Sequence, residues 1–140
     1  MNRKTVLLCL ISIFLSPSAL AVDFLCQKPS YGRTVKHPHH LIRLNMDESA
    51  GMASGTHYWM RQDANELLIE VKEWDLGGSR VEDLRVIITS GYFSPGAYLD
   101  RQTLWLRGFD DMKCEIISDF DTRLQKYKEE AASNVPARAF

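Results

Sequence analysis

The sequence predicts an all-β fold: a small antiparallel β-barrel or sandwich of about seven strands in a meander, closed by one disulfide and followed by a C-terminal amphipathic helix. Three observations predict it. Short segments of alternating apolar and polar residues run from Phe24 to Ile117, with turn residues about every 8–13 positions. No helical pattern separates them, so a parallel sheet lacks its crossover connections. Two cysteines, Cys26 and Cys114, lie near the two ends of this region.

The first 21 residues have the pattern of a secretory signal peptide. A basic segment at residues 2–4 precedes an apolar run at 6–15, and Ala19-Leu20-Ala21 is the small-x-small pattern that signal peptidase accepts. The run is shorter than the roughly 20 apolar residues that a membrane-spanning helix needs. We therefore expect cleavage near Ala21 and a periplasmic or secreted mature protein.

The expected strands share an alternation that places one row of side chains on each face of a sheet. Ile42, Leu44 and Met46 show it, alternating with Arg43 and Asn45. We expect strands around Cys26 and at residues 42–46, 52–60, 66–74, 81–89, 103–108 and 112–117, with an irregular segment at 90–98.

Cys26 and Cys114 are expected to form one disulfide, because an even pair in an oxidising compartment is most simply bridged. The bond closes a loop of about 88 residues and stabilises the fold by about 4–5 kcal/mol in the chain-entropy model. It places the first and last strands side by side. A metal site is less suited to these cysteines, because no C-x-x-C spacing is present.

After the last strand, apolar residues including Phe120 and Leu124 recur at helical spacing, and Asp121 suits the positive end of a helix dipole. Pro136 follows and ends the pattern. The expected organisation is a signal peptide at 1–21, a β domain at 22–118, a C-terminal helix at 119–132 and a disordered tail at 133–140.

Composition excludes several classes of partner. Removal of residues 1–21 leaves 15 basic and 18 acidic residues, with no basic patch, so we expect no nucleic-acid partner. No second apolar stretch is long enough for a membrane anchor. No cofactor is expected, and the pattern does not indicate an oligomeric state.

The stretch VKHPHHLIRL holds three of the four histidines. In an extended segment His37 and His39 point to one face and His40 to the other, and Pro38 disfavours regular pairing there. A near-symmetric hairpin brings His57, on the next strand, beside His39 or His40. One interpretation is a metal site built from these four histidines. We favour exposed histidines on an edge strand, because a structural zinc site needs four converging ligands.

No catalytic motif is found, and we expect no enzyme activity. The sequence contains neither G-x-S-x-G nor H-E-x-x-H. Ser54 and His57 lie three residues apart on an expected strand, so their side chains point to opposite faces and do not readily share a proton.

The stretch ASGTHYW, residues 53–59, is the most unusual of the expected strands. Gly55 in mid-strand indicates a bulge or a close approach by another backbone. Tyr58 and Trp59 point to opposite faces, so one ring is expected in the core and the other at the surface. Exposed aromatic rings near arginines such as Arg107 are typical of protein-binding hot spots. The alternative is a two-layer fold that buries both faces.

Ser54-Gly55-Thr56-His57-Tyr58 matches the pattern S-G-x-x-Y. With a cysteine just after the signal and another near the end, the chain resembles the periplasmic lysozyme inhibitors of the C-type and membrane-bound class. In that family the serine loop enters the lysozyme cleft and reaches its catalytic acids, so the resemblance implies an inhibitor. The family's second motif, Y-x-x-x-T-K-G, is not matched: TLWLRG at residues 103–108 departs from it and lies about 50 residues after Tyr58.

We therefore expect a small secreted or periplasmic binding protein, in its most concrete form an inhibitor or immunity-type protein of a cell-wall hydrolase such as lysozyme. The expected partner is a protein, contacted by Ser54, Gly55, His57, Tyr58, Trp59 and Arg107. One alternative is a lipocalin-like carrier that holds a small apolar ligand inside the barrel. Another is a periplasmic metal-binding protein that uses the histidine cluster.

Overall fold

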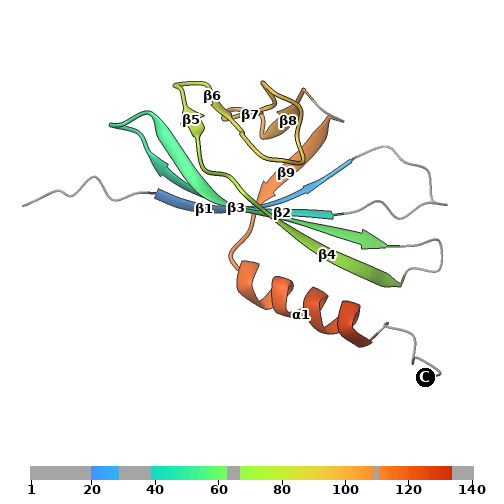
Figure 1. The fold of residues 1–140 in the computed structure, drawn as a ribbon. Coiled ribbons are helices and arrows are strands. Elements are labelled where there is room, and N and C mark those ends of the chain that lie inside the picture. The colour runs from blue at the N-terminus through green and yellow to red at the C-terminus, as the bar shows by residue number, and fades with distance from the viewer. Residues whose placement is uncertain (1–19, 29–38, 63–66, 109–110, 134–140) are drawn as a thin grey trace, which may run out of the picture.

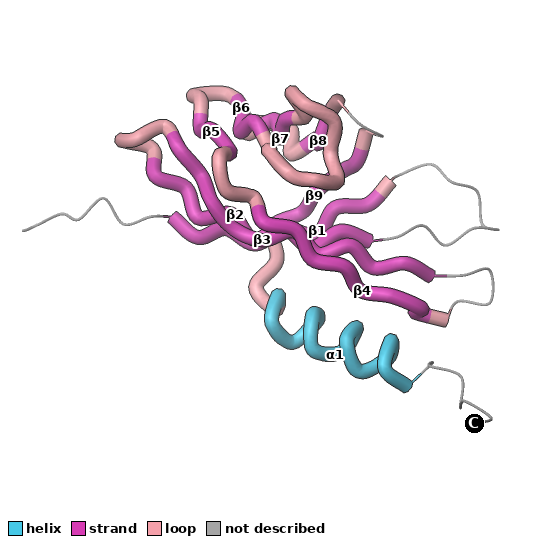
Figure 2. Tube along the Cα trace, viewed as in Figure 1, coloured by secondary structure: helices cyan, strands magenta, loops and turns pink. Residues whose placement is uncertain are grey.

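A computed structural model describes residues 20–28, 39–62, 67–108 and 111–133 (Figures 1 and 2). These residues form nine strands and one helix: β1 (Leu20–Gln27), β2 (His39–Asp47), β3 (Met52–Gln62), β4 (Leu68–Asp75), β5 (Ser79–Val81), β6 (Arg85–Ile87), β7 (Tyr98–Asp100), β8 (Trp105–Arg107), β9 (Met112–Ile116) and α1 (Phe120–Ser133).

The strands confirm the predicted antiparallel barrel. Their order is β2-β1-β9-β8-β7-β6-β5-β3, and a further pairing of β2 with β3 closes this ring of eight. β4 lies outside the ring and pairs only with β3. The segment expected as one strand at 81–89 is instead divided between β5 and β6, and the segment expected to be irregular at 90–98 leads into β7. Strands of three residues are too short to show an alternating pattern, which explains the difference from the seven strands expected.

Gly55 is the point at which β3 changes its partner. Residues 56–62 of β3 pair with β4, whereas Met52 and Ala53 pair with β5. Gly55 has φ +144°, and a Cβ atom there would lie 1.8 Å from the carbonyl oxygen of Arg43 on β2. The predicted close approach of another backbone is therefore confirmed, and it requires a residue without a side chain.

The predicted disulfide between Cys26 and Cys114 is also confirmed, with the two sulfur atoms 2.03 Å apart. The two residues lie directly opposite each other on β1 and β9. Both side chains are buried inside the barrel, so the bond joins the first and last strands of the ring within the core.

Two apolar clusters lie on the two faces of the long strands. The first fills the barrel and includes Phe24, Leu44 and Leu106 together with the disulfide. The second lies between the outer face of β1–β4 and the helix, where Leu41 and Met60 meet residues of α1. The helix thus forms a separate layer beneath the sheet (Figure 1).

Helix α1 begins one residue later and ends one residue later than the predicted 119–132. Phe120 and Leu124, two of the expected apolar residues, are its buried side chains. Ser133 is helical rather than part of a tail, and residues 134–140 lie outside the described residues.

The predicted signal peptide falls mostly outside the described residues, which begin at Leu20. Leu20 and Ala21 form the first two positions of β1, opposite Met46 and Asn45 of β2. In the described part of the chain, no helix is both long enough and apolar enough to cross a membrane.

Candidate functional site

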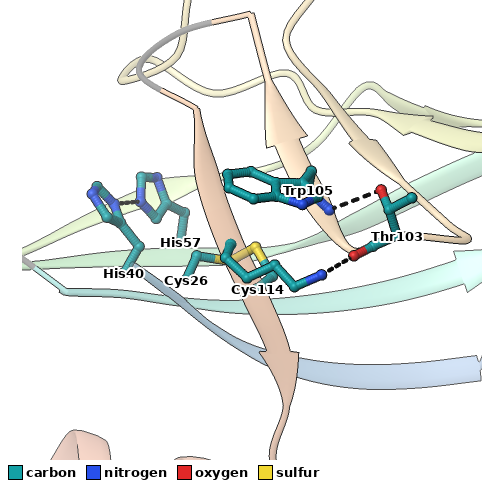
Figure 3. The surroundings of a disulfide bond; sticks show 7 residues. Cys26, His40, His57, Thr103, Trp105 and Cys114 are labelled. Atoms are coloured by element: carbon teal, nitrogen blue, oxygen red, sulfur yellow. Dashed lines mark hydrogen bonds between the residues drawn. A yellow bond between two sulfur atoms is a disulfide. The ribbon is translucent and has the colours of Figure 1, made fainter. Parts of the chain in front are cut away.

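His40 and His57 form a buried pair between β2 and β3. His40 lies opposite Trp59, and His57 lies opposite Ile42, so the two histidines are diagonal neighbours on the inner face. His40 Nδ1 and His57 Nε2 share a hydrogen bond of 2.8 Å (Figure 3). Their exposed fractions are 2% and 0%, so the interpretation of these two residues as exposed edge histidines is wrong.

The reason is the position of the two residues on their strands. His40 shares its face of β2 with Ile42 and Leu44, which point into the barrel, and β2 pairs with β1 on one side and β3 on the other, so it is not an edge strand. An apolar row that ends in a histidine looks the same in sequence whether the last residue is buried or exposed. The hairpin symmetry that was expected does place His57 beside His40.

Aromatic side chains enclose the histidine pair. The His57 ring stacks on Phe93 with 4.7 Å between ring centroids and on Trp74 with 5.3 Å. Tyr92 lies 5.1 Å from His40 and 5.2 Å from Trp74, again between centroids. Tyr92 and Phe93 belong to the segment between β6 and β7, which was expected to be irregular and was not assigned a role. The aromatic enclosure therefore depends on a contact that the local sequence pattern does not show.

Burial and the neighbouring His40 lower the pKa of His57 to about 2. His57 is therefore neutral at physiological pH, and one of its ring nitrogens takes part in the hydrogen bond with His40. The hydroxyl of Ser90 lies 3.4 Å from His57 Nδ1. An imidazole with so low a pKa is a weak proton acceptor, and no solvent reaches it. This geometry suits a role in holding the barrel together.

The structure brings together two of the four histidines considered as metal ligands. His39 points to the opposite face of β2 from His40, because neighbouring side chains alternate along a strand. His37 lies outside the described residues. Within the described ranges, no group of three or more His, Cys, Asp or Glu side chains is arranged to hold a metal ion.

The S-G-x-x-Y residues occupy the middle of β3, which pairs with β2 along this whole stretch. Ser54 is exposed and lies opposite Asn45. Tyr58 points to the same outer face, where its ring lies 6.0 Å from that of Phe120 on α1. Strand alternation directs His57 to the inner face. The expected partner-binding residues of β3 are thus divided between the two faces.

A second group of residues lies on the outer wall formed by β8 and β9, where Arg107 and Lys113 are exposed and Trp105 is half-buried. The ring of Trp105 has the guanidinium of Arg107 5.0 Å from its centroid and the ammonium of Lys113 5.7 Å from it. Lys113 is opposite Trp105 in the strand register, and its ammonium also donates to the Thr103 carbonyl (Figure 3). We call Trp105, Arg107 and Lys113 the Trp105 patch. Arg107 was expected as a contact residue, whereas Lys113 joins it only through strand pairing.

A third feature is an apolar pocket of about 130 Å³ at the end of the barrel opposite the histidine pair. Its lining includes Phe24, Met46 and Leu99, which are buried, and Ile116, which is exposed. The pocket therefore leads from the surface into the barrel core. Carrier proteins hold their ligands in cavities of about 300–1,000 Å³, so this pocket is much smaller than a lipocalin-like carrier needs.

Comparison of the chain with family models, with curated proteins and with solved structures finds no match. The structural features that bear on function are therefore the enclosed histidine pair, the Trp105 patch and the apolar pocket.

Proposed function

We propose that the protein is a secreted or periplasmic protein-binding domain that inhibits a cell-wall hydrolase such as lysozyme. The observation that carries this proposal is the Trp105 patch, an aromatic ring flanked by Arg107, two residues along β8, and by Lys113, directly opposite on β9. Tryptophan and arginine are the residues most often found as energetic hot spots in protein interfaces.

The charge of the patch suits the proposed target. Glycoside hydrolases cleave their substrates with two carboxyl groups that flank the scissile bond. A cleft lined by such acids attracts a partner that presents cations, and the attraction increases the rate of association. Arg107 and Lys113 are exposed on the outer wall and can supply these cations.

The filled barrel supports binding at the outer surface. Apart from the small pocket at one end, its interior is occupied by apolar side chains, the histidine pair and the buried disulfide. A frame of this kind holds surface residues in fixed positions, which lowers the entropy lost when a partner binds. The disulfide also fits an oxidising compartment, which is where cell-wall hydrolases act.

Ser54 provides a second contact that can be tested separately. The resemblance to lysozyme inhibitors rests on the S-G-x-x-Y residues, and Ser54 is exposed on the outer face of β3. β3 and β8 are separated in the barrel by β5, β6 and β7, so the two contacts belong to different sides of the molecule. A single substitution at each position therefore distinguishes them.

The decisive experiment is an inhibition assay on a C-type lysozyme and on purified periplasmic lytic enzymes, with the turbidity of a cell-wall suspension as the readout. We expect the wild type to inhibit, and Arg107→Ala to weaken inhibition about tenfold or more, as truncation of a hot-spot arginine does. Among the described residues, Arg107 forms an ion pair with the exposed Asp111, and such a pair contributes little free energy, so its loss leaves folding nearly unchanged.

Arg85→Ala is the matched control. Arg85 is also exposed on the barrel wall, lies over the ring of Tyr98 and pairs with Glu82, but it belongs to β6. Inhibition should be unchanged in this variant. A loss in Ser54→Ala with full inhibition by Arg107→Ala would assign the contact to the S-G-x-x-Y residues instead of the patch. No inhibition of any of these enzymes by the wild type would refute the proposed function.

A further inference from the structure

The apolar pocket at the barrel end has the size of one small chemical group. Its volume is about 130 Å³. A protein cavity of about 150 Å³ lined by apolar side chains stays dry and accepts benzene. The pocket therefore suits a phenyl ring or a branched aliphatic group, and it excludes the larger ligands that carrier barrels hold.

The surroundings of the pocket extend its apolar surface to the outside. Ile116 lines the pocket and is 63% exposed. An exposed apolar side chain at the rim of a concave apolar site adds to the surface that a ligand can cover.

Leu104 contributes a strained backbone to the pocket lining. It has φ +60°, the only positive φ among the non-glycine residues that the structure describes. The Asp100 carboxylate holds the turn by accepting hydrogen bonds from the N–H groups of Gln102, at 2.8 Å, and Thr103, at 2.9 Å. Leucine is unfavourable in this conformation, and residues held in such conformations are enriched at functional sites.

Arg101 gives the pocket its charge. It is the one charged residue among the described residues that line the pocket. Its Nη1 donates to the Glu82 carbonyl at 2.9 Å, and its Nη2 forms an ion pair with the exposed carboxylate of Glu48. An ion pair with an exposed partner contributes little free energy. A ligand carboxylate can therefore replace Glu48 on the guanidinium, whose planar shape suits two parallel hydrogen bonds to a carboxylate.

We propose that this pocket binds an organic carboxylate that carries one phenyl-sized or branched apolar group. The apolar group enters between Phe24, Leu99 and Leu104, and the carboxylate pairs with Arg101 at the edge. Free aryl or branched-chain acids have this chemistry, and so does the last residue of a peptide that ends in Phe or Leu. The site is separate from the Trp105 patch and does not depend on the inhibitor function.

Calorimetric titration of the purified protein with two probe pairs tests the proposal. The first pair is 3-phenylpropanoate and its uncharged amide, and the second is N-acetyl-glycyl-phenylalanine and its C-terminal amide. We expect both acids to bind with dissociation constants in the millimolar range or tighter, and each amide to bind roughly tenfold more weakly. Tighter binding by one acid than by the other identifies the source of the ligand, a free acid or a chain end.

Three variants locate the site. Ile116→Trp covers the entrance from an exposed position and should abolish binding, while Met52→Trp, at another exposed position on the outer face of β3, should leave it unchanged. Arg101→Met should remove the difference between acid and amide. Glu48→Gln should bind the acids several-fold more tightly, because it removes the competing carboxylate; misfolding cannot produce this gain.

Two results would overturn the proposal. One is the absence of binding by either acid to the wild type. The other is binding that Ile116→Trp leaves intact, or equal dissociation constants for each acid and its amide.

Discussion

At the scale of single residues, Gly55 shows most directly how one position determines the shape of the barrel. β3 pairs with β4 on one side of Gly55 and with β5 on the other, and the backbone of β2 comes close at this point. The carbonyl of Arg43 occupies the space that a side chain at position 55 would need. The glycine of the S-G-x-x-Y pattern therefore has a structural function, whatever its neighbours bind.

Gly55→Ala is expected to destabilise the fold by at least about 3 kcal/mol, because a Cβ atom would clash with main-chain atoms at a positive φ. The midpoint of urea unfolding measures this. Gly96→Ala is the control, since Gly96 also has a positive φ but has no atom near the added group; it should cost only about 1 kcal/mol. Equal effects of the two substitutions would contradict the steric explanation.

The buried histidine pair makes stability depend on pH. The pKa of His57 is about 2 in the folded protein and 6.5 in an unfolded chain. Between these values the unfolded state binds the proton and the folded state does not, so stability falls as the pH decreases below 6.5. We expect this residue to lower the free energy of unfolding by roughly 1 kcal/mol for each pH unit well below 6.5.

His57→Gln separates this contribution from that of the carboxylates. Glutamine cannot take up a proton in this range, so the variant should show a shallower decrease in unfolding free energy between pH 6.5 and 4.5, measured by urea titration at several pH values. Parallel pH profiles for the two proteins would show that His57 is not the group responsible.

At the scale of elements, α1 packs against the outer face of strands β1–β4. Arg43 of β2 ties the start of the helix to the sheet: it donates to Asp23 at 2.7 Å and to Asp121 at 3.1 Å, and its guanidinium lies over the Phe120 ring. Further along, Leu124 packs into the second apolar cluster. The helix is therefore held by one mixed polar and aromatic contact and by an apolar seam.

Leu124→Ala should destabilise the protein by about 2–3 kcal/mol, at the lower end of the range for buried leucines, because the site lies near the surface and can relax. Gln125→Ala, at the exposed neighbouring position, should change stability by less than about 0.5 kcal/mol. Hydrogen exchange would show faster exchange in α1 of the leucine variant. Unchanged protection of the helix would mean that the apolar seam does not hold it.

At the scale of the whole molecule, the disulfide joins strands that are far apart in sequence. Cys26 and Cys114 are separated by 88 residues, and the bond lies inside the barrel. Replacing both with alanine should lower the unfolding free energy by about 4–5 kcal/mol in the chain-entropy model. Guanidinium unfolding of the variant and the wild type measures the difference. A change below about 1 kcal/mol would mean that the unfolded chain is already compact, so that the bond restricts it little.

Most of the overall architecture could be predicted from the sequence. The alternation around Ile42 to Met46, the two cysteines and the spacing of Phe120 and Leu124 predicted the barrel, its bond and its helix, because each pattern is local or follows from a single pair. The burial of His40 and the meeting of Trp105 with Lys113 could not be predicted in this way. His40 is enclosed by Tyr92 and Phe93, which come from a segment without a regular pattern. The facing of Trp105 and Lys113 depends on the exact register of the β8–β9 hairpin, which alternation does not determine.

The pairing of β1 with β9 has a consequence for the order of events in time. The ring cannot close until the ribosome has made residues 112–116. Until then, the edge of β1 that pairs with β9 has no partner strand. Contacts of such long sequence separation form slowly. A nascent chain that stalls before Met112 therefore leaves an open sheet edge, the structure most prone to pair with another chain. Synthesis of β9 therefore converts an aggregation-prone open sheet into a closed barrel.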